Sequence, residues 1–346
     1  MKLSKKNFQD AVKIAMMATT QDSTVYASGD CLLFDNNTIY SYNGYTSIAK
    51  KFITEEPLQG AVRAKELFSI INKIQDKEFE IKDIGKSWNI RAGRANYELV
   101  KKADLELNSI ERIIPKDNEW IYIPDNLFEA LNFCILNDNN TNIFIGDDVV
   151  YSTDGFRIYQ YKLSTLMTNK VLINTQLVKS VVNFNNIKGY AVTKGWIHFR
   201  DDDGSIISVR KYDTSQYPKD EIERVIKENT DGDYVKCAIP DMLIQVIDRA
   251  SILSKEVDKY DAITMKLTNT GITVKSNNEY GKFEESTDAE IPYNAEFVVS
   301  VIMLKDCLKD TDSFYIRKIA VKGTAKETVN LVFSSSNGIK ILSTMD

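Results

Sequence analysis

The chain is 346 residues long and carries 44 Lys and Arg against 49 Asp and Glu, a net charge of −5, with one His and four Cys. This length has room for two or three domains, and the composition is typical of a globular protein. No apolar run approaches the roughly 18 residues of a membrane helix, and charges interrupt the apolar part of the N-terminus, so we expect neither a membrane segment nor a signal peptide. The scattered cysteines favour buried reduced thiols and a cytoplasmic protein.

A helix with one apolar face is predicted three times along the chain, over residues 4–18, 124–137 and 240–255. In each helix apolar residues recur three and four positions apart, the spacing that places them on one side. The second and third include Pro124-Asp125 and Pro240-Asp241 at their start, and both residue types suit a first helical turn. The starts lie about 115–120 residues apart, which is too long for a solenoid repeat and indicates like domains.

A second apolar-faced helix follows inside each repeat, over residues 63–75, 174–186 and 297–309, and alternating strand patterns fill the intervening stretches. The polar segments ERIIPKDNEW and IKENTDGD separate the repeats. We therefore expect an α+β fold of three repeated domains, each with two helices packed on β-sheets. Their expected limits are residues 1–117, 118–230 and 231–346.

Charge is unevenly distributed between the expected helices and the rest of the chain. The six helices hold 11 Lys and Arg against 7 Asp and Glu, whereas the remainder holds 33 against 42. If the helices share one surface, that surface is basic and suits a nucleic acid, although the helix at 124–137 is itself acidic. The imbalance alone is a weak signal, because lysine is a good helix former in any protein.

The sequence shows no signature of catalysis. It has no phosphate-binding glycine loop, no dinucleotide-binding glycine motif and no Cys-x-x-Cys pair. His198 alternates with apolar neighbours on an expected strand and lacks a nucleophile or orienting carboxylate, so a general base there is a minor alternative. The run Asp201–Asp203 lacks the ligand spacing of a calcium loop and fits a hairpin turn, with a metal-dependent nuclease as the alternative. We expect no catalytic residue, no metal and no cofactor.

Four segments of the chain resemble one protein family. RASILSKE at 249–256 is similar to its R-x-A-I-L-S-N-E segment, and STDGFRIY at 152–159 to its A-T-D-G-H-R-L segment. VRAKELFSIINKI at 62–74 and IRAGRANYEL at 90–99 are similar to its pattern A-K-x-L-F…I-R-S-G-R-S-x-F-x-L. The family is the bacterial sliding clamp, the beta subunit of the replicative DNA polymerase III. The similarity follows the family's order along essentially the whole chain.

The resemblance implies the DNA clamp fold, with the two helices of each domain inside and the sheets outside. Two protomers would join head to tail, domain one to domain three, as a homodimeric ring around double-stranded DNA, without sequence preference. Such a ring tethers DNA polymerase and also receives the clamp loader and other proteins that carry a clamp-binding peptide. The implied function is that of a processivity factor in DNA replication, which is not an enzyme.

The resemblance also implies a peptide pocket between domains two and three. Its walls are the T-D-G segment, the segment YPKDEIERVI and the C-terminal strand. YPKDEIERVI carries an insertion relative to the family pattern, the T-D-G segment also suits a plain turn, and each apolar pocket residue also suits the core. The implied pocket residues are Thr153, Gly155, Arg157, Ile158, Pro218, Arg224, Val225, Ile341, Leu342 and Met345.

Two further residue sets follow from the same resemblance. The ring interface would bring Tyr97 and Leu99 of domain one against Ile252 and Leu253 of domain three. Ile252 is the better candidate, because Leu253 also fits the apolar face of its helix. Basic side chains on the helices would face the DNA phosphates, although a solvated helix face explains any one of them equally well. The DNA-facing candidates are Lys5, Lys13, Lys65, Lys73, Lys179, Arg249 and Lys255.

The chain departs from the family pattern at several points. Phe156 stands where the family commonly has histidine, and the C-terminus reads STMD instead of a P-M-R-type tail. Such divergence suggests an unusual lineage or a bacterial virus with specialised partners. The alternative to a closed ring is a clamp-like, partner-binding adaptor that keeps the fold and stays monomeric.

Overall fold

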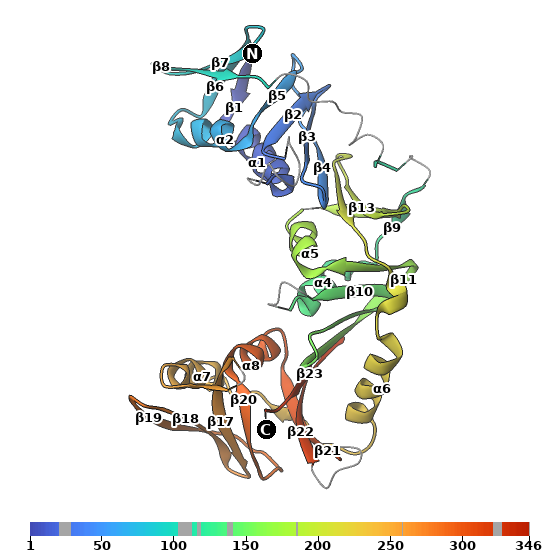
Figure 1. Ribbon diagram of the computed structural model, residues 1–346, viewed down its shortest axis with the longest axis vertical. Coiled ribbons are helices and arrows are strands. Elements are labelled where there is room, and N and C mark those ends of the chain that lie inside the picture. Colours follow the sequence, from blue (N-terminus) through green and yellow to red (C-terminus); the bar gives the residue numbers. More distant parts are fainter. Residues whose placement is uncertain are drawn as a thin grey trace. The chain divides into compact units, whose positions relative to one another are not determined.

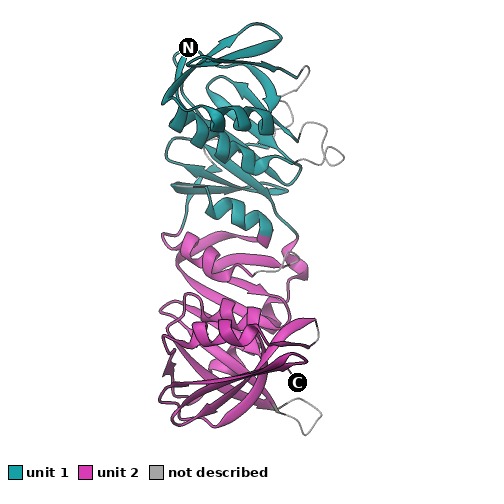
Figure 2. Cartoon of the chain, turned by 90° about the vertical axis from the view of Figure 1, so that its left-hand side faces the viewer, with its two compact units in different colours: residues 1–123, 176–212 teal, residues 124–175, 213–346 magenta. Residues whose placement is uncertain are grey.

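The computed structural model describes residues 1–20, 29–102, 113–115, 119–136, 141–184, 186–257, 259–320 and 327–345. The chain forms two compact units, coloured separately in Figure 2. Unit 1 consists of residues 1–123 and 176–212, and unit 2 of residues 124–175 and 213–346. The middle part of the chain is thus shared between the units, because its strands join two different sheets.

Seven α-helices lie in the described part of the chain, and six of them occupy the positions where the sequence predicts three helix pairs (Figure 1). The seventh, α6, lies outside the predicted pairs. The helices are α1 (Lys5–Ala15), α2 (Ala64–Lys73), α4 (Leu127–Cys134), α5 (Thr175–Val182), α6 (Lys219–Thr230), α7 (Leu243–Ser251) and α8 (Val301–Leu308), with short 3-10 turns at Met16–Ala18 and Thr214–Gln216.

Unit 1 contains an eight-stranded sheet in the order β5-β2-β3-β4-β14-β13-β12-β9 and a four-stranded sheet in the order β1-β6-β7-β8. In the larger sheet β4 pairs antiparallel with β14, with Ile48 opposite Ile207. Its strands are β2 (Cys31–Asp35), β3 (Thr38–Tyr42), β4 (Thr46–Lys51), β5 (Gly60–Arg63), β9 (Ile121–Tyr122), β12 (Ile187–Val192), β13 (Trp196–Asp201) and β14 (Ile206–Arg210). The smaller sheet consists of β1 (Lys2–Ser4), β6 (Glu78–Asp83), β7 (Ser87–Ala92) and β8 (Ala95–Val100).

Unit 2 contains a six-stranded sheet in the order β10-β11-β23-β22-β21-β15, and a five-stranded sheet in which β16-β17-β18-β19 are neighbours and β20 pairs with β17. The first consists of β10 (Asn142–Thr153), β11 (Arg157–Asn174), β15 (Cys237–Ala238), β21 (Ser313–Ala320), β22 (Glu327–Ser334) and β23 (Gly338–Ser343). The second consists of β16 (Lys255–Val257), β17 (Tyr260–Thr268), β18 (Gly271–Asn278), β19 (Gly281–Asp288) and β20 (Ala295–Ser300).

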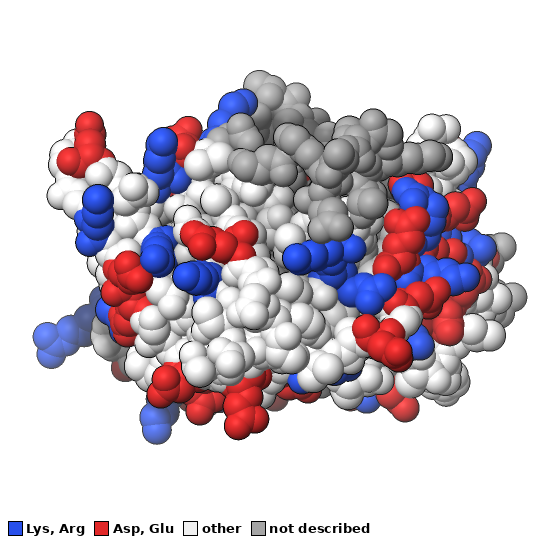
Figure 3. Space-filling model, turned by 90° about the horizontal axis from the view of Figure 1, so that it is seen from below, with Lys and Arg blue, Asp and Glu red and all other residues white. Residues whose placement is uncertain are grey.

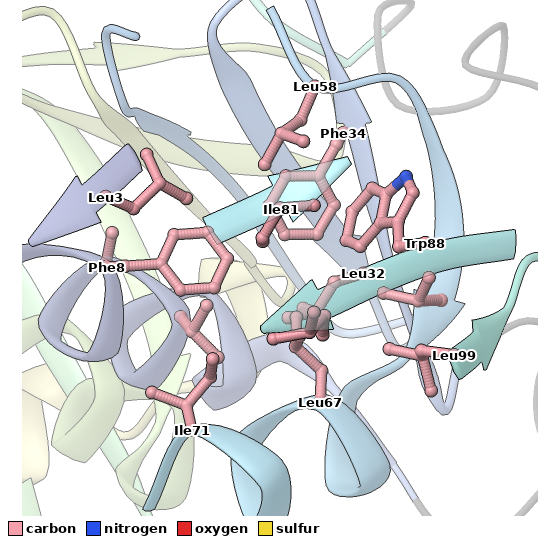
Figure 4. Close-up of a cluster of buried hydrophobic side chains, with 14 of the residues drawn as sticks. Leu3, Phe8, Leu32, Phe34, Leu58, Leu67, Ile71, Ile81, Trp88 and Leu99 are labelled. Atoms are coloured by element: carbon pink, nitrogen blue, oxygen red, sulfur yellow. The ribbon is translucent and has the colours of Figure 1, made fainter. Parts of the chain in front are cut away.

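The core of unit 1 is a cluster of aromatic and aliphatic side chains from α1, α2 and both sheets (Figure 4). The ring of Phe8 on α1 lies edge-on to Phe79 with centroids 5.5 Å apart, and Phe34 lies edge-on to Trp88 at 4.8 Å. Full burial of a side chain like Phe8 stabilises the fold by about 1.5–3 kcal/mol. Leu99 of β8 belongs to the same cluster.

The helix pairs recur with the same local connections. α2, α5 and α8 each begin at the residue that follows a strand, namely β5, β11 and β20. α4 and α7 each follow a turn in which the N–H of Leu127 or Leu243 donates to the carbonyl of Pro124 or Pro240. The prolines therefore precede these helices instead of opening their first turn, because their carbonyls close the preceding turn.

The predicted helix over 240–255 is too long at its C-terminal end. α7 stops at Ser251, and Lys255 already belongs to β16. The hydroxyl of Ser251 donates to the carbonyl of Asp248 at 2.7 Å, and that of Ser254 donates to the carbonyl of Ser251 at 2.8 Å. Side-chain bonds of this kind compete with the helical backbone and favour an end at this point.

The division into three domains, 1–117, 118–230 and 231–346, stays a prediction. Each large sheet contains strands from two of the expected domains, since β4 pairs with β14 in unit 1 and β11 with β23 in unit 2. α6 also runs to Thr230, through the first part of the segment expected to separate the second and third domains.

Two simpler expectations concern the cysteines and the membrane. Cys31, Cys134, Cys237 and Cys307 are buried and free, as predicted. Burial is the main cause that raises the pKa of Cys31 and of Cys307 to about 12, so these thiols are poor nucleophiles. None of the helices that the structure describes has the length and apolarity that a membrane crossing requires.

Candidate functional site

Four of the predicted pocket residues are neighbours across one strand pair in unit 2. β11 runs antiparallel to β23, with Arg157 opposite Leu342 and Ile158 opposite Ile341. Ile341 and Leu342 are buried at 2% and 0% exposure, whereas Ile158 is only partly buried. The T-D-G segment and the C-terminal strand are therefore adjacent, as the resemblance implies.

The T-D-G segment forms the tight turn between β10 and β11. The Asp154 carboxylate accepts hydrogen bonds from the backbone N–H groups of Phe156 at 3.0 Å and Arg157 at 2.7 Å. Thr153 donates its hydroxyl to the carbonyl of Arg157 at 2.7 Å. Gly155 has a φ of +89°, which L side chains rarely adopt. This segment is thus a turn that fixes the start of β11, and its place in a peptide pocket stays a prediction.

Arg157 is a buried structural residue, with 3% exposure. Its guanidinium donates to Asp154 from Nε at 2.8 Å and from Nη2 at 2.6 Å, and its Nη1 donates to Asp306 of α8 at 2.8 Å. Both carboxylates are themselves largely buried. The side chain therefore ties the turn before β11 to α8, and all three of its nitrogens are engaged inside unit 2.

Helix α6 covers an apolar cluster that includes the predicted pocket residue Ile341. Ile222 and Ile226 of α6 are 3% and 7% exposed. The side-chain amide of Asn229 donates to the carbonyl of Val225 and accepts a hydrogen bond from the amide of Asn330. We call this group the α6 cluster. Its buried members are Phe144, Val149, Tyr151, Leu172, Ile222, Ile226, Tyr315, Val332 and Ile341, and its partly buried members are Ile158, Tyr217, Tyr293 and Ile339.

A signal for α6 is present in the sequence. Ile222, Val225, Ile226 and Asn229 are spaced as one helix face, and Pro218 precedes an acidic first turn. The helix is not among those predicted, because YPKDEIERVI is compared with a family segment and its extra residues are interpreted as an insertion.

The remaining pocket candidates lie at the surface of unit 2 or near it. Pro218 is exposed at the start of α6, and Arg224 is exposed and paired with Glu221 and Glu228 on the same helix. Val225 and Met345 are partly buried, and Met345 forms an isolated bridge with Val298. The structure brings Ile158 and Ile341 together with α6, and a shared pocket of all ten residues stays a prediction.

The predicted interface residues lie at or near sheet edges of their own units. Tyr97 and Leu99 belong to β8, an edge strand of the four-stranded sheet, where Tyr97 is partly buried and Leu99 is 8% exposed. Ile252 follows α7 and is 77% exposed, whereas Leu253 is partly buried. Ile252 thus remains the better interface candidate, and Leu99 contributes to the core of unit 1 (Figure 4).

The predicted DNA-facing residues differ in how free their charges are. Lys13, Lys65 and Lys73 are exposed on α1 and α2. Lys5 donates its Nζ to the carbonyl of Ile74 at 2.6 Å, and Lys179 on α5 is partly buried. Arg249 on α7 is held by Glu285 of β19, and Lys255 lies on β16 instead of a helix.

His198 is a core residue. Its side chain is fully buried, with Nδ1 2.8 Å from the Ser208 hydroxyl and Nε2 3.0 Å from the Thr193 hydroxyl. Burial lowers the pKa of His198 to about 4, so the ring is neutral at pH 7. Two hydroxyl partners and complete burial indicate a structural role.

The run Asp201–Asp203 forms the hairpin between β13 and β14, as predicted. The ammonium of Lys50 lies 3.5 Å from Asp201 and 2.6 Å from Asp203, so a cation already occupies the space between the carboxylates. Burial, together with the hydrogen bond to Asp203, raises the pKa of Asp201 to about 6. Among the described residues, no group of three or more His, Cys, Asp and Glu could hold a metal ion.

Comparison with known proteins connects this fold to one class of structures. No protein-family model matches the chain, and no curated protein matches its sequence. A DNA polymerase sliding clamp from Pseudomonas aeruginosa superposes with a TM-score of 0.76 at 16% identity, over 100% of this chain and 99% of that chain. A putative DNA polymerase III beta subunit from Eubacterium rectale ATCC 33656 does so with 0.74 at 19% identity, over 100% and 99%.

Two further structures show the same likeness. The DNA polymerase sliding clamp of Bacillus subtilis has a TM-score of 0.74 at 16% identity, over 100% of this chain and 98% of that chain. A Pseudomonas aeruginosa clamp bound to griselimycin has 0.76 at 16% identity, over 100% and 99%. The chain therefore has the fold of the bacterial DNA sliding clamps over its whole length.

Proposed function

We propose that this chain is the processivity clamp of a replicative DNA polymerase, a ring that encircles duplex DNA and keeps the polymerase on it. The observation that carries the proposal is the fold, because solved DNA polymerase sliding clamps match it over 100% of the chain. Exposed lysines on α1 and α2 and the apolar α6 cluster support the proposal from the chain's own residues.

Double-stranded DNA is the proposed ligand of the helix surfaces. The ammonium groups of Lys13, Lys65 and Lys73 are exposed, and no ion pair engages them in the described part of the chain. Lysine binds phosphate as a point charge without reading the base sequence, and this attraction falls steeply with salt concentration. Weak, sequence-independent contacts of this kind suit a protein that has to slide along the duplex.

A head-to-tail homodimer is the proposed assembly. β8 in unit 1 and β19 in unit 2 are edge strands of their sheets, and neither pairs with a further strand on its outer side among the described residues. An open edge is a template for pairing with another chain. Pairing β8 of one protomer with β19 of a second would satisfy both edges, and it would bury exposed apolar side chains such as Ile252 and Val100.

DNA polymerase, the clamp loader and other replication or repair proteins are the proposed peptide partners. Ile158 keeps part of its side chain exposed beside the buried Ile341, its neighbour in the β11–β23 pair. A short apolar peptide could therefore extend the α6 cluster at its open side. The Pseudomonas aeruginosa clamp bound to griselimycin supports the expectation that this fold offers a ligand site.

The proposal includes no catalytic step and no metal or cofactor. His198 and Asp201 have the chemistry most suited to catalysis. His198 is hydrogen-bonded to Ser208 and Thr193, and Asp201 is paired with Lys50. A protein with this function would work in the cytoplasm, where bacterial and phage DNA is replicated.

Topology provides the sharpest test of the proposed ring. The protein, loaded by its clamp loader onto a nicked circular plasmid, should co-elute with the DNA in gel filtration at physiological salt. Cutting the plasmid at one site should release it, because a ring slides off a free end. Streptavidin on both biotinylated ends of the linear DNA should restore retention. Equal loss from circular and linear DNA would contradict the ring.

Native mass separates the ring from the adaptor alternative. The clamp should have twice the chain mass of 39.4 kDa at micromolar concentration. A monomer under these conditions would favour a clamp-like adaptor that binds partners without closing around DNA.

A further inference from the structure

We propose that this protein binds DNA asymmetrically. Most of the electrostatic attraction to the phosphates comes from the α1–α2 pair of unit 1, and little comes from the α7–α8 pair of unit 2. This inference rests on the proposed clamp function, and it names the surface that meets the phosphates.

The α1–α2 pair carries an excess of exposed basic side chains. The Gln9 Nε2 donates to the Asn72 Oδ1 at 2.5 Å, so the exposed sides of the two helices lie next to each other. Lys6 and Lys13 are seven residues apart and therefore share the face of α1 opposite to the buried Phe8. Together α1 and α2 contain five lysines against two acidic residues, a net charge of +3.

The lysines of this surface are available to a ligand. Lys6, Lys13, Lys65 and Lys73 are exposed, and none of them lies in an ion pair with another described residue. Only Lys5 is committed, because its Nζ donates to a backbone carbonyl. When free ammonium groups neutralise phosphates, the DNA releases its condensed counterions, and that release supplies the salt-dependent part of DNA affinity.

The α7–α8 pair is different in both charge and chemistry. It contains two basic and two acidic residues, so its net charge is zero. Arg249 donates to Glu285 at 2.8 and 2.6 Å, and Lys305 donates to Asp248 at 2.5 Å. Each cation would have to leave a carboxylate before it could bind a phosphate, so each contributes less to DNA binding.

The outer side of α7 and α8 is also more apolar than that of α1 and α2. Its exposed residues include Ile244 at 41%, Ile302 at 54% and, just before α7, Met242 at 48%. Such side chains offer phosphates neither charge nor hydrogen bonds. On the face seen from below in Figure 3, acidic and basic side chains are intermixed and uncharged side chains cover much of the area between them.

The other two helices of the predicted pairs add little in either direction. α4 carries Glu129 as its only charged residue, and α5 carries Lys179. The excess of positive charge on the six helices of the predicted pairs is therefore concentrated on α1 and α2.

A purely structural role for these lysines makes a different prediction. Lys13 and Lys73 lie in the last turns of α1 and α2, where a cation also stabilises the negative end of the helix dipole. In that case their replacement would lower the melting temperature and leave DNA affinity unchanged. The test therefore measures the melting temperature and the DNA affinity of the same variants.

Three double variants with an equal change of charge provide the test. They are Lys13→Gln with Lys73→Gln on α1–α2, Arg249→Gln with Lys305→Gln on α7–α8, and Lys82→Gln with Lys266→Gln as a control on exposed strand positions. Fluorescence anisotropy with a labelled duplex gives the apparent Kd of each full-length protein between 25 and 150 mM NaCl, about the range over which phosphate binding shows in the salt slope.

The expected result is a weakening confined to the first variant. The slope of log Kd against log salt should fall by up to about 3.6 for the Lys13–Lys73 variant, because the proposed dimer loses four lysines and each neutralised phosphate adds roughly 0.9 to that slope, and by less than about 0.5 for the other two. An equal fall for the Arg249–Lys305 variant, or no fall for the Lys13–Lys73 variant, would overturn the asymmetry. If the Lys13–Lys73 variant does not fold, Lys6→Gln with Lys65→Gln replaces it.

Failure of this inference is distinguishable from failure of the clamp function. Retention on circular but not on linear DNA, together with equal slopes for the helix variants, would keep the ring and overturn the asymmetry. Unequal slopes together with equal loss from both DNA forms would keep the asymmetric surface and overturn the ring.

Discussion

The hydroxyl of Ser41 donates a 2.6 Å hydrogen bond to the backbone carbonyl of Ala15, the last residue of α1. Carbonyls in the last turn of a helix have no partner within the helix. Ser41 on β3 is 2% exposed and Ala15 is 0% exposed, so this carbonyl is hydrogen-bonded by the serine inside the protein and not by solvent.

The same bond occurs twice more in the chain. Ser152 donates to the carbonyl of Cys134 at 2.6 Å, at the last residue of α4. Ser276 donates to the carbonyl of Ala250 at 2.7 Å, in the last turn of α7. Each time a buried serine on a strand donates to a carbonyl in the last turn of the first helix of a predicted repeat. This shared detail supports the triplication that the sequence periodicity predicts.

Removal of these hydroxyls should destabilise the protein at all three positions. Ser41→Ala, Ser152→Ala and Ser276→Ala should each lower the free energy of unfolding by about 0.5–1.5 kcal/mol, because each variant loses one buried hydroxyl-to-carbonyl hydrogen bond. Urea unfolding followed by circular dichroism measures the change. Ser336→Ala, at an exposed turn position, should stay within about 0.5 kcal/mol of the original chain. A decrease at only one serine would show that the three bonds are not equivalent.

Replacement of Arg157 should affect stability before it affects partner binding. Arg157→Ala leaves the largely buried carboxylates of Asp154 and Asp306 without their cation, which typically costs about 3–5 kcal/mol. Arg224→Ala removes an exposed pair and should change stability by less than about 1 kcal/mol. Thermal unfolding of both variants checks the difference. A stable Arg157→Ala protein with reduced peptide affinity would instead make Arg157 a direct peptide contact.

A charge at Ile252 should separate the proposed dimer. Ile252→Asp places a carboxylate where an apolar side chain would be buried, and an unpaired buried charge is costly at an interface. Analytical ultracentrifugation at micromolar concentration should then show monomers that keep the fold. Ile53→Asp is the matched control, because Ile53 is 84% exposed in unit 1 and is not an interface candidate. A dimer that survives Ile252→Asp would remove this residue from the joint.

His198 should make the protein less stable in mild acid. Its folded-state pKa of about 4 lies below the value of 6.5 for a free imidazole. As pH falls from 6.5 to 4, the unfolded chain binds a proton that the folded chain excludes, so the free energy of unfolding falls by roughly 3 kcal/mol. Above pH 6.5 both states hold a neutral ring, and this contribution vanishes.

Comparison with His198→Gln isolates this effect. The variant cannot titrate at this position, so its free energy of unfolding should depend less on pH between 6.5 and 4.5. Asp201 titrates in the same window with the opposite sign, because its raised pKa favours the folded state at lower pH. That contribution is common to both proteins and cancels in their difference. Parallel pH profiles would show that His198 is protonated as readily when folded as when unfolded.

Local patterns predict most of the helices but not their limits. The apolar spacing of Phe8 and Val12, or of Leu243 and Val246, identifies real helices with buried faces. The pattern extends one helix to Leu253, because an apolar residue at the right spacing looks the same in a helix and in the turn after it. The end at Ser251 depends on hydroxyl-to-carbonyl bonds that spacing does not reveal.

The candidate site is predictable only where its parts are local or follow a family pattern. The turn at Thr153–Arg157 is encoded by five consecutive residues, and the resemblance implies that Ile158 and Ile341 belong to one pocket. Asp306 lies 149 residues from Arg157, so no local pattern shows that it holds the guanidinium. The free or paired state of each helix lysine is equally invisible in the sequence.

The sequence by itself determined three apolar-faced helix pairs, an excess of basic residues on helices and the absence of a catalytic motif, because periodicity and composition are properties of neighbouring residues. The tertiary structure alone decided which cations remain free for phosphate. The sequence does not show whether a basic residue on α1 or on α7 is paired with a carboxylate. Only the folded chain places Glu285 of β19 against Arg249. Coulombic pairing depends on distance in space, and folding sets that distance.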